Sequence, residues 1–164
     1  MRIRTAEPED AEKLVQLIAD AENSNFMMFE PGERKMTANQ LKKRIEAMEN
    51  EKTSAILLAD LEGELLGYLF VIGNTPQRVR HAAYLAIGIS EKSRGAGVGT
   101  KLFERLEEWA KETNITRLEL TVMVHNRAGL GLYQKRGFKI EGIKKNSLMV
   151  DGKYIDEYYM AKLI

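Results

Sequence analysis

Cysteine is absent from the 164 residues of this chain. The protein therefore has no disulfide bonds, no thiolate metal ligands and no covalent cysteine intermediate. No apolar run approaches the roughly 18 residues of a membrane-spanning helix, and the N-terminus has no apolar targeting segment. An excess of one charge is also missing, with 25 Lys and Arg against 24 Asp and Glu. Since no global field attracts nucleic acid or an acidic membrane, we expect a soluble, cytoplasmic protein without those partners.

The remaining composition is typical of one globular domain. Hydrophobic residues make up 44% of the chain and charged residues 30%, as in ordinary soluble proteins. A chain of this length can bury about two-thirds of its unfolded surface. No internal repeat, low-complexity stretch or Pro/Gly/Ser-rich linker divides the sequence, so we expect a single domain over residues 1–164.

Local patterns predict a mixed α/β fold with one central sheet and helices on both faces. Leu102, Leu106 and Trp109 recur at helical spacing, and Asp10 and Thr37 are expected to cap helices. The β-rich runs are Ile3–Ala6, Ser54–Leu61, Leu65–Ile72, Ala82–Ile89, Leu118–Val124, Phe138–Lys145 and Lys153–Lys162. The helical runs follow Asp10 and span Thr37–Met48, Val98–Glu112 and Arg127–Arg136.

Three glycines lie between the buried strand Ala82–Ile89 and the helix that begins at Val98, in the segment Arg94–Thr100. Glycine has no Cβ, so the backbone can turn sharply and bring its N–H groups close to a ligand. The start of the helix adds unpaired N–H donors and the positive end of the dipole. Arg94 can add a charge-assisted contact. The segment therefore predicts an anion site.

Other glycine-rich loops fit this segment poorly. A Walker P-loop ends in Gly-Lys-Ser/Thr, whereas this segment reads Gly99-Thr100-Lys101. The dinucleotide fingerprint is Gly-x-Gly-x-x-Gly, but Gly95, Gly97 and Gly99 are spaced evenly by two. A strand–helix connection without a ligand is the remaining alternative.

Two motifs resemble the GNAT superfamily of N-acetyltransferases. Arg94-x-x-Gly97-x-Gly99 looks like its acetyl-CoA signature, and the second motif is Asn126-x-x-Gly129-x-x-Leu132-Tyr133-x-x-x-Gly137-Phe138. Gly129 departs from the pattern, where alanine is more usual. The order of elements is similar over essentially the whole chain. The resemblance implies a GNAT fold, a mostly antiparallel sheet whose splayed central strands form a slot for CoA, with acetyl-CoA as co-substrate.

The resemblance also implies which residues bind the co-substrate. The loop amides would hold the pyrophosphate, and Gly88 would form a bulge that separates two parallel strands. Asn126 would contact pantetheine, although a simple N-cap role is equally open. The backbones of two isoleucines would pair with the pantetheine arm. The predicted set is Ile87, Ile89, Arg94, Gly95, Ala96, Gly97, Val98, Gly99, Thr100 and Asn126.

Tyr133 is the predicted general acid, because family members place an acid there and a phenol can protonate a departing thiolate. Packing beside Phe138 is the alternative. The general base is open, since Ala83 stands where many family members have a glutamate. Candidates for the acceptor side are Glu30, Glu33 and Tyr84, with Asp156, Glu157 or a chain of water molecules as further possibilities.

The two histidines, His81 and His125, lie at predicted strand ends without carboxylates at ligand spacing, so no metal site is expected. The apolar segment Phe26–Phe29 lies in an aperiodic stretch, and long irregular segments often carry function. We therefore expect it to form part of the wall facing the acceptor.

These features together predict an acetyl-CoA-dependent N-acetyltransferase that uses direct attack in a ternary complex. The acceptor is a primary amine: a polyamine, a protein N-terminus or lysine, or a small-molecule amine. A homodimer is compatible with the sequence. The alternative is a CoA- or acyl-CoA-binding regulatory module without turnover, which the absence of a glutamate at Ala83 would favour and Tyr133 would not.

Overall fold

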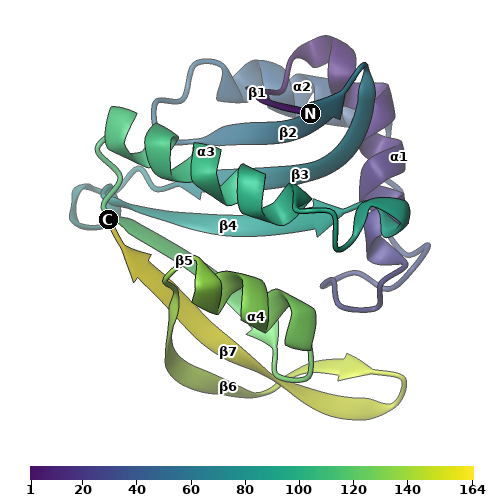
Figure 1. The fold of residues 1–164 in the computed structure, drawn as a ribbon, viewed down its shortest axis with the longest axis vertical. Coiled ribbons are helices and arrows are strands. Elements are labelled where there is room, and N and C mark those ends of the chain that lie inside the picture. The colour runs from purple at the N-terminus through teal and green to yellow at the C-terminus, as the bar shows by residue number, and fades with distance from the viewer.

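Seven strands form one sheet in the order β1-β2-β3-β4-β5-β7-β6 in the computed structural model, which describes residues 1–164 (Figure 1). All neighbouring pairs are antiparallel except β4 and β5, which are parallel. The strands are β1 (Arg2–Thr5), β2 (Ala55–Leu61), β3 (Glu64–Gly73), β4 (Ala82–Ile89), β5 (Arg117–Met123), β6 (Lys139–Val150) and β7 (Lys153–Leu163). The predicted mixed sheet is confirmed.

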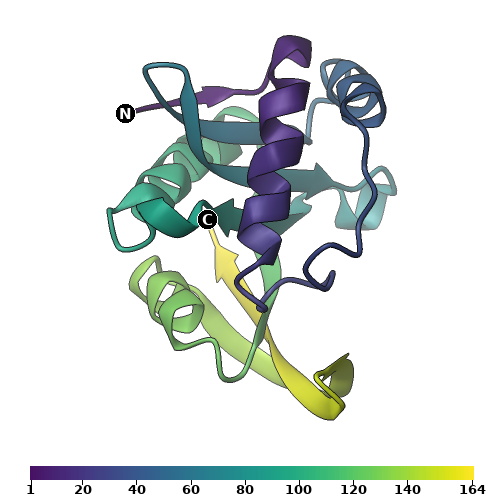
Figure 2. The ribbon, with the colours of Figure 1, turned by 90° about the vertical axis from the view of Figure 1, so that its right-hand side faces the viewer.

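Helices cover both faces of the sheet, as predicted. On one face lie α1 (Ala11–Glu22) and α2 (Ala38–Met48), and on the other α3 (Val98–Glu112) and α4 (Arg127–Lys135) (Figures 1 and 2). Each pair buries its own apolar cluster against the sheet. Leu102 and Leu106 of α3 are fully buried in one cluster, and Leu14 of α1 in the other. The strands thus separate an α3/α4 face from an α1/α2 face.

One of the two predicted helix caps is confirmed. The Thr37 hydroxyl accepts from the Gln40 N–H at 3.1 Å, and the Gln40 side chain accepts from the Thr37 N–H at 3.0 Å, which is a complete capping box. The prediction for Asp10 is wrong, because its side chain does not cap α1. A 3-10 turn (Pro8–Asp10) precedes that helix, and the Asp10 carboxylate accepts from the Glu7 N–H at 2.7 Å and from Arg4.

The last hairpin is longer than the sequence predicted. The sequence suggests that the first strand ends at Lys145, whereas β6 continues to Val150 with a register shift between Lys144 and Leu148. The shift is held by Asp156, whose carboxylate accepts from the Asn146 N–H at 2.8 Å. A bulge interrupts the period-2 alternation that marks a strand in sequence, so the second half of the strand was missed.

The two central strands separate, as the resemblance implied. β4 and β5 are paired only from Ala82↔Arg117 to Tyr84↔Glu119, although both continue beyond that point. In Figure 1 they leave a common origin and diverge toward the start of α3. β4 remains paired with β3 along its length. From Leu85 onward, the side of β4 that faces β5 therefore lacks a neighbouring strand.

Gly88 does not produce this separation, and the predicted bulge is wrong. The β3–β4 register runs without a shift through Tyr68↔Gly88. A Cβ at Gly88 would instead overlap the tip of the Tyr68 ring. Glycine is required at this position because a buried aromatic side chain from the neighbouring strand lies directly on the backbone.

Gly88→Ala should therefore destabilise the fold by about 1–3 kcal/mol, the usual cost of overpacking a core. Gly131→Ala is the matched control, because Gly131 lies in α4 with no atom within 4 Å of an added Cβ. That substitution should stabilise the protein by about 0.5–1 kcal/mol through helix propensity. Urea unfolding at neutral pH measures both. Equal effects of the two substitutions would contradict the proposed contact between Tyr68 and Gly88.

Candidate active site

The start of α3 is open to a ligand. Its N-cap residue, Gly97, has φ +81° and no side chain caps the helix. Gly95 has φ +76°, and an added Cβ at either glycine would meet no atom within 4 Å. The first N–H groups of a helix have no intrahelical acceptor. These donors, with the exposed Arg94 beside them, remain available to an anion.

Gly99 has a different role from the other two glycines of the loop. It lies in the first turn of α3 without a positive φ. A Cβ there would come within 2.7 Å of Leu132 Cδ2 in α4. Gly99 therefore allows α4 to approach α3 closely, while its N–H remains one of the donors at the helix start.

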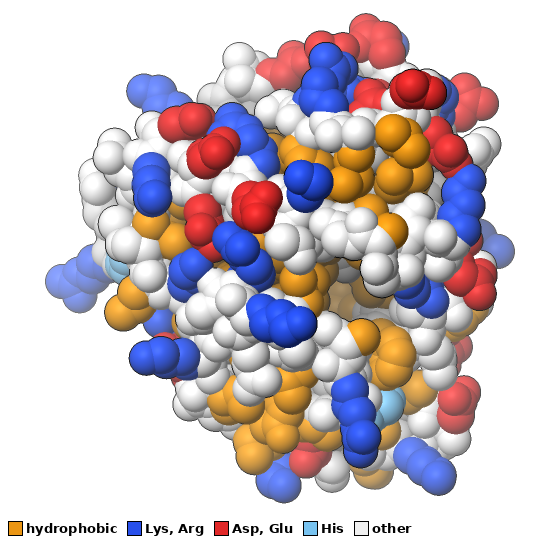
Figure 3. All heavy atoms as spheres, in the orientation of Figure 1, with side chains coloured by type: hydrophobic (Ala, Val, Ile, Leu, Met, Phe, Trp, Pro, Cys, Tyr) orange, Lys and Arg blue, Asp and Glu red, His pale blue; other side chains and the backbone are white.

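The gap between β4 and β5 lies directly beside this helix start. Ile87 and Ile89 direct their side chains into the core on the α3/α4 face, as predicted, so only their backbones can contribute to the gap. Figure 3 shows the surface hollowed between the start of α3 and α4, with Lys and Arg side chains around the hollow. An elongated ligand with an anionic group at the helix start could thus extend between the strands.

Asn126 caps α4. Its Oδ1 accepts from the Gly129 N–H at 3.0 Å, which confirms the simple cap role and leaves the side-chain Nδ2 as a donor. A Cβ at Gly129 would lie 2.7 Å from that nitrogen. The departure of Gly129 from the family pattern therefore makes room for the Asn126 amide. Its predicted contact with pantetheine stays a prediction.

Tyr133 projects from α4 into the α3/α4 core. Its ring packs edge-on against Phe103 and Phe138, with centroids 5.7 and 6.2 Å away, so the predicted packing is present. Burial raises the pKa of the Tyr133 hydroxyl well above its usual value, and Tyr84 adds a smaller effect in the same direction. A raised pKa keeps this phenol protonated, which is the state that a general acid requires.

Tyr84 lies on the opposite, α1/α2 face of the sheet, where its hydroxyl is 2.9 Å from Thr121 Oγ1 of β5. Ala83 points the other way into the α3/α4 core and is fully buried. A carboxylate at position 83 of this strand would therefore not face the α1/α2 side. Of these two residues, only Tyr84 faces the α1/α2 side. Its neighbour Thr121 was not singled out from the sequence.

The segment between α1 and α2 reaches across to the far half of the sheet. Phe26 lies against the His125 ring with centroids 5.3 Å apart, and the Asn25 side-chain amide donates to Asp151 at 3.2 Å. The segment therefore spans the open end of the gap, and the role of Phe26–Phe29 as a wall facing the acceptor stays a prediction. His125, expected to be a plain strand-end residue, is part of this contact.

The two acidic residues predicted for this segment are exposed, whereas Glu22, which the sequence did not single out, is buried beside it. Glu30 and Glu33 are exposed, and the Glu33 carboxylate accepts from the Glu30 N–H at 2.8 Å. Glu22 at the end of α1 is 4% exposed and is paired with Arg34 at 3.2 Å. A carboxylate at the end of a helix has no sequence signal that separates it from a surface residue.

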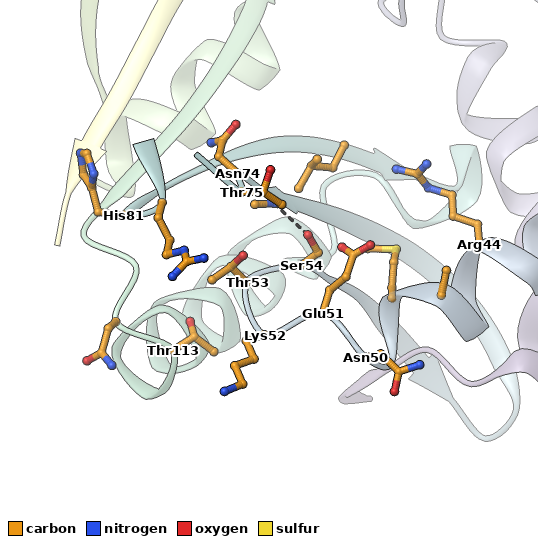
Figure 4. A pocket seen from close by; sticks show the side chains of 16 residues that line it. Arg44, Asn50, Glu51, Lys52, Thr53, Ser54, Asn74, Thr75, His81 and Thr113 are labelled. Carbon is orange, nitrogen blue, oxygen red and sulfur yellow. Dashed lines mark hydrogen bonds between the residues drawn. The ribbon is translucent and has the colours of Figure 1, made fainter. Parts of the chain in front are cut away.

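A second hollow lies at the other end of the sheet. It is a cleft of about 1040 Å³ formed by the ends of α2 and α3 and the end of β3 (Figure 4). Its lining is mainly polar and includes Arg44, Glu51, Arg80 and His81. The cleft lies at the opposite end of α3 from the glycine loop, where no α-helix begins. The gap between β4 and β5, and not this cleft, carries the features of an anionic-ligand site.

Comparison with known proteins agrees with this geometry. The family model described as acetyltransferase (GNAT) family matches residues 15–138, which include both motifs. The chain belongs to this family. A GNAT acetyltransferase from Streptococcus pneumoniae has 34% sequence identity and a TM-score of 0.94, covering 99% of this chain and 98% of that one. The GNAT fold predicted from the sequence is thus confirmed.

Two curated relatives support the same enzyme class. The L-amino acid N-acetyltransferase of Escherichia coli is 32% identical over 108 residues, 65% of this chain and 67% of its own. An N-alpha-acetyltransferase of Sulfurisphaera tokodaii is 27% identical over 171 residues, covering 98% of this chain and 91% of the relative. The predicted enzyme class, an acetyl-CoA-dependent N-acetyltransferase, is confirmed.

Two further findings concern sites outside the gap. No group of three or more His, Cys, Asp or Glu side chains is placed to hold a metal ion. No helix of this acetyltransferase combines the length and the apolar character that crossing a membrane requires.

Gly97→Ala should weaken binding of CoA at least about tenfold, because a Cβ would enter the space above the N–H groups that face the anion. Gly152→Ala in the β6–β7 turn is the matched control, since Gly152 has φ +75° and equally open surroundings. Both substitutions should cost about 1–2 kcal/mol of folding stability through the left-handed backbone. Calorimetric titration with CoA separates them. Equal CoA affinities for the two variants would show that the loop does not hold the ligand.

Proposed function

We propose that this GNAT enzyme transfers the acetyl group of acetyl-CoA to an α-amino group, with residues 1–164 acting as one catalytic domain. The observation that carries the proposal is the interrupted β4–β5 pairing beside an uncapped helix start. The open backbone edge of β4 matches an arm that carries amide groups, and the helix start matches a pyrophosphate. This combination suits CoA better than a compact anion.

The residues present fit this co-substrate. Within Arg94–Thr100, the N–H groups of Arg94 and Ala96 already donate to backbone carbonyls, so the remaining loop amides would hold the pyrophosphate, with Gly95 and Gly97 leaving the space that a Cβ would fill. The backbones of Ile87 and Ile89 would pair with the pantetheine arm. The Asn126 side-chain Nδ2, free of the cap bond, would donate to the same arm.

Acetyl-CoA supplies the acetyl group as a thioester, whose C–S bond breaks as the amine nitrogen forms its C–N bond. Tyr133 donates its hydroxyl proton to the departing sulfur and then regains a proton from solvent. An acceptor ammonium loses two protons overall, one of them before attack. No Cys of this chain can carry the acetyl group, since the chain has none, which supports direct transfer.

An α-amino acceptor agrees with the lack of a carboxylate base beside Tyr84. Because position 83 is an alanine, no carboxylate there removes the first proton from the acceptor, and water or a surface carboxylate must do so. An α-amino group with a pKa of about 8 is partly neutral at physiological pH, whereas a lysine or polyamine nitrogen near 10.4 is almost fully protonated. The peptide N-terminus is therefore the acceptor we favour.

Relatives act on the same functional group. Besides the L-amino acid and N-alpha enzymes already described, a ribosomal-protein-alanine N-acetyltransferase from Brucella melitensis has 25% identity and a TM-score of 0.89 over the whole of both chains. The α-amino group is common to these acceptors. Free amino acids, N-terminal peptides, lysine side chains and polyamines form the panel that tests the acceptor class.

Release of the CoA thiol in the presence of each amine of this panel tests the proposed reaction. The substitution Tyr133→Phe tests the role of Tyr133 as general acid. The variant should lower kcat roughly 10²-fold, the usual contribution of general acid catalysis, with CoA affinity changed less than about threefold. Tyr154→Phe is the matched control, because Tyr154 is 64% exposed at the start of β7. An unchanged kcat in Tyr133→Phe would reduce Tyr133 to a packing residue. CoA binding without thiol release for any amine would indicate the regulatory module instead.

The pH profile tests the protonation state of Tyr133 independently. Because burial raises the pKa of Tyr133, the phenol stays protonated throughout the neutral and mildly alkaline range. The value of kcat/KM should rise with pH as the acceptor ammonium deprotonates. No decline of kcat/KM is expected at any pH up to about 10. A fall near pH 8 in protein that remains folded by circular dichroism would contradict this assignment.

A further inference from the structure

Tyr84 crosses the gap between the central strands just where their pairing ends. The last backbone pair is Tyr84↔Glu119, and the Tyr84 hydroxyl bonds with Thr121 Oγ1 at 2.9 Å, two residues further along β5. The backbone pairing is thus extended by one side-chain bridge. On the α1/α2 face this bridge closes the narrow end of the gap.

A second tyrosine lies at the other end of the same strand face. Side chains on one face of a strand alternate, so Ala86 and Gly88 follow Tyr84 at intervals of about 7 Å. The ring of Tyr68 covers Gly88. Tyr68 is 2% exposed, and its hydroxyl has no hydrogen-bond partner. Ala86, the small and partly exposed residue between them, therefore lies in a niche bounded by two aromatic side chains.

The reacting end of the co-substrate lies near this niche if the proposed function holds. Tyr133 is the proposed proton donor to the sulfur, and it is buried in the same α3/α4 core cluster as Leu85 of β4 and Val122 of β5, the two strands that border the gap. The acyl carbon is bonded directly to that sulfur. An acyl group beside Tyr133 would therefore extend through the gap toward Ala86, with the ring of Tyr84 beyond it.

We propose that Tyr84, held in place by Thr121, limits the length of the acyl group and selects acetyl over propionyl and butyryl. This inference rests on the proposed function. The methyl of an acetyl group is the smallest tail that an acyl group placed over Ala86 could carry. Each further methylene would have to displace an aromatic ring that is fixed by a hydrogen bond across the two strands.

The effect of such a steric limit is measurable. One methylene too many in a fitted pocket lowers kcat/KM by about 10- to 200-fold. A tyrosine that is merely exposed on a strand would instead have no influence on acyl length. Tyr84 is 40% exposed, so its replacement by alanine removes bulk at the surface of the sheet without opening the core.

The experiment compares kcat/KM for acetyl-, propionyl- and butyryl-CoA at a saturating concentration of the best amine from the panel. The wild-type protein should disfavour butyryl-CoA at least about tenfold relative to acetyl-CoA. Tyr84→Ala should raise the butyryl/acetyl ratio at least about tenfold. Tyr84→Phe retains the ring and should stay closer to wild type than to Tyr84→Ala. The exposed Tyr154→Ala is the matched control, with an unchanged ratio.

An unchanged butyryl/acetyl ratio in Tyr84→Ala would overturn the proposal, as would equal use of the two donors by the wild-type protein or equal ratios in the Phe and Ala variants. If Tyr84→Ala binds CoA without turnover, the dissociation constants of butyryl-CoA and acetyl-CoA provide the same ratio, and no shift again overturns it. Absence of amine-dependent thiol release by wild type with acetyl-CoA would instead reject the proposed function.

Discussion

The active site of this protein depends on one interruption of the backbone hydrogen bonding. After Tyr84 and Glu119, β5 leaves β4 and continues with β7. Buried backbone N–H and C=O groups are costly when they have no partner, so the open edge of β4 is stable only because solvent or a ligand can reach it. The helix start of α3 places a second set of free donors at the wide end of the same gap. A ligand with both amide and phosphate groups satisfies the two sets together.

Glycine has three different functions around this gap. At Gly95 and Gly97 a left-handed backbone leaves space for a ligand, whereas at Gly99 the missing side chain lets α4 pack against α3. At Gly88 the missing Cβ makes room for Tyr68, and at Gly129 for the Asn126 amide. Residues that belong to one sequence motif thus serve packing at some positions and leave open space at others. The motif requires each of them for a separate steric reason.

In the proposed reaction, the two faces of the sheet have different roles. The α3/α4 face, with the helix start and Tyr133, would present the donor. The α1/α2 face, which carries Tyr84, Thr121 and the segment that joins Phe26 to His125, would receive the acceptor. Because the gap connects both faces, a donor and an amine can approach from opposite sides. This arrangement favours direct transfer in a ternary complex over a covalent intermediate.

The sequence alone determined the order of elements and the bounds of β4 and α3, and it predicted an anion site at the start of α3, because these follow from local periodicity, glycine and helix-end chemistry. It misassigned Asp10, whose carboxylate is bound by Arg4 across a 3-10 turn, and Gly88, whose partner Tyr68 is set by strand pairing. It could not identify Thr121 beside Tyr84 or Arg34 beside Glu22. Only the tertiary structure decided these contacts. The contacts of Tyr84 with Thr121 and of Tyr68 with Gly88 depend on strand order and register, which arise from packing of the whole sheet, and the other contacts depend on the path of the connecting segments.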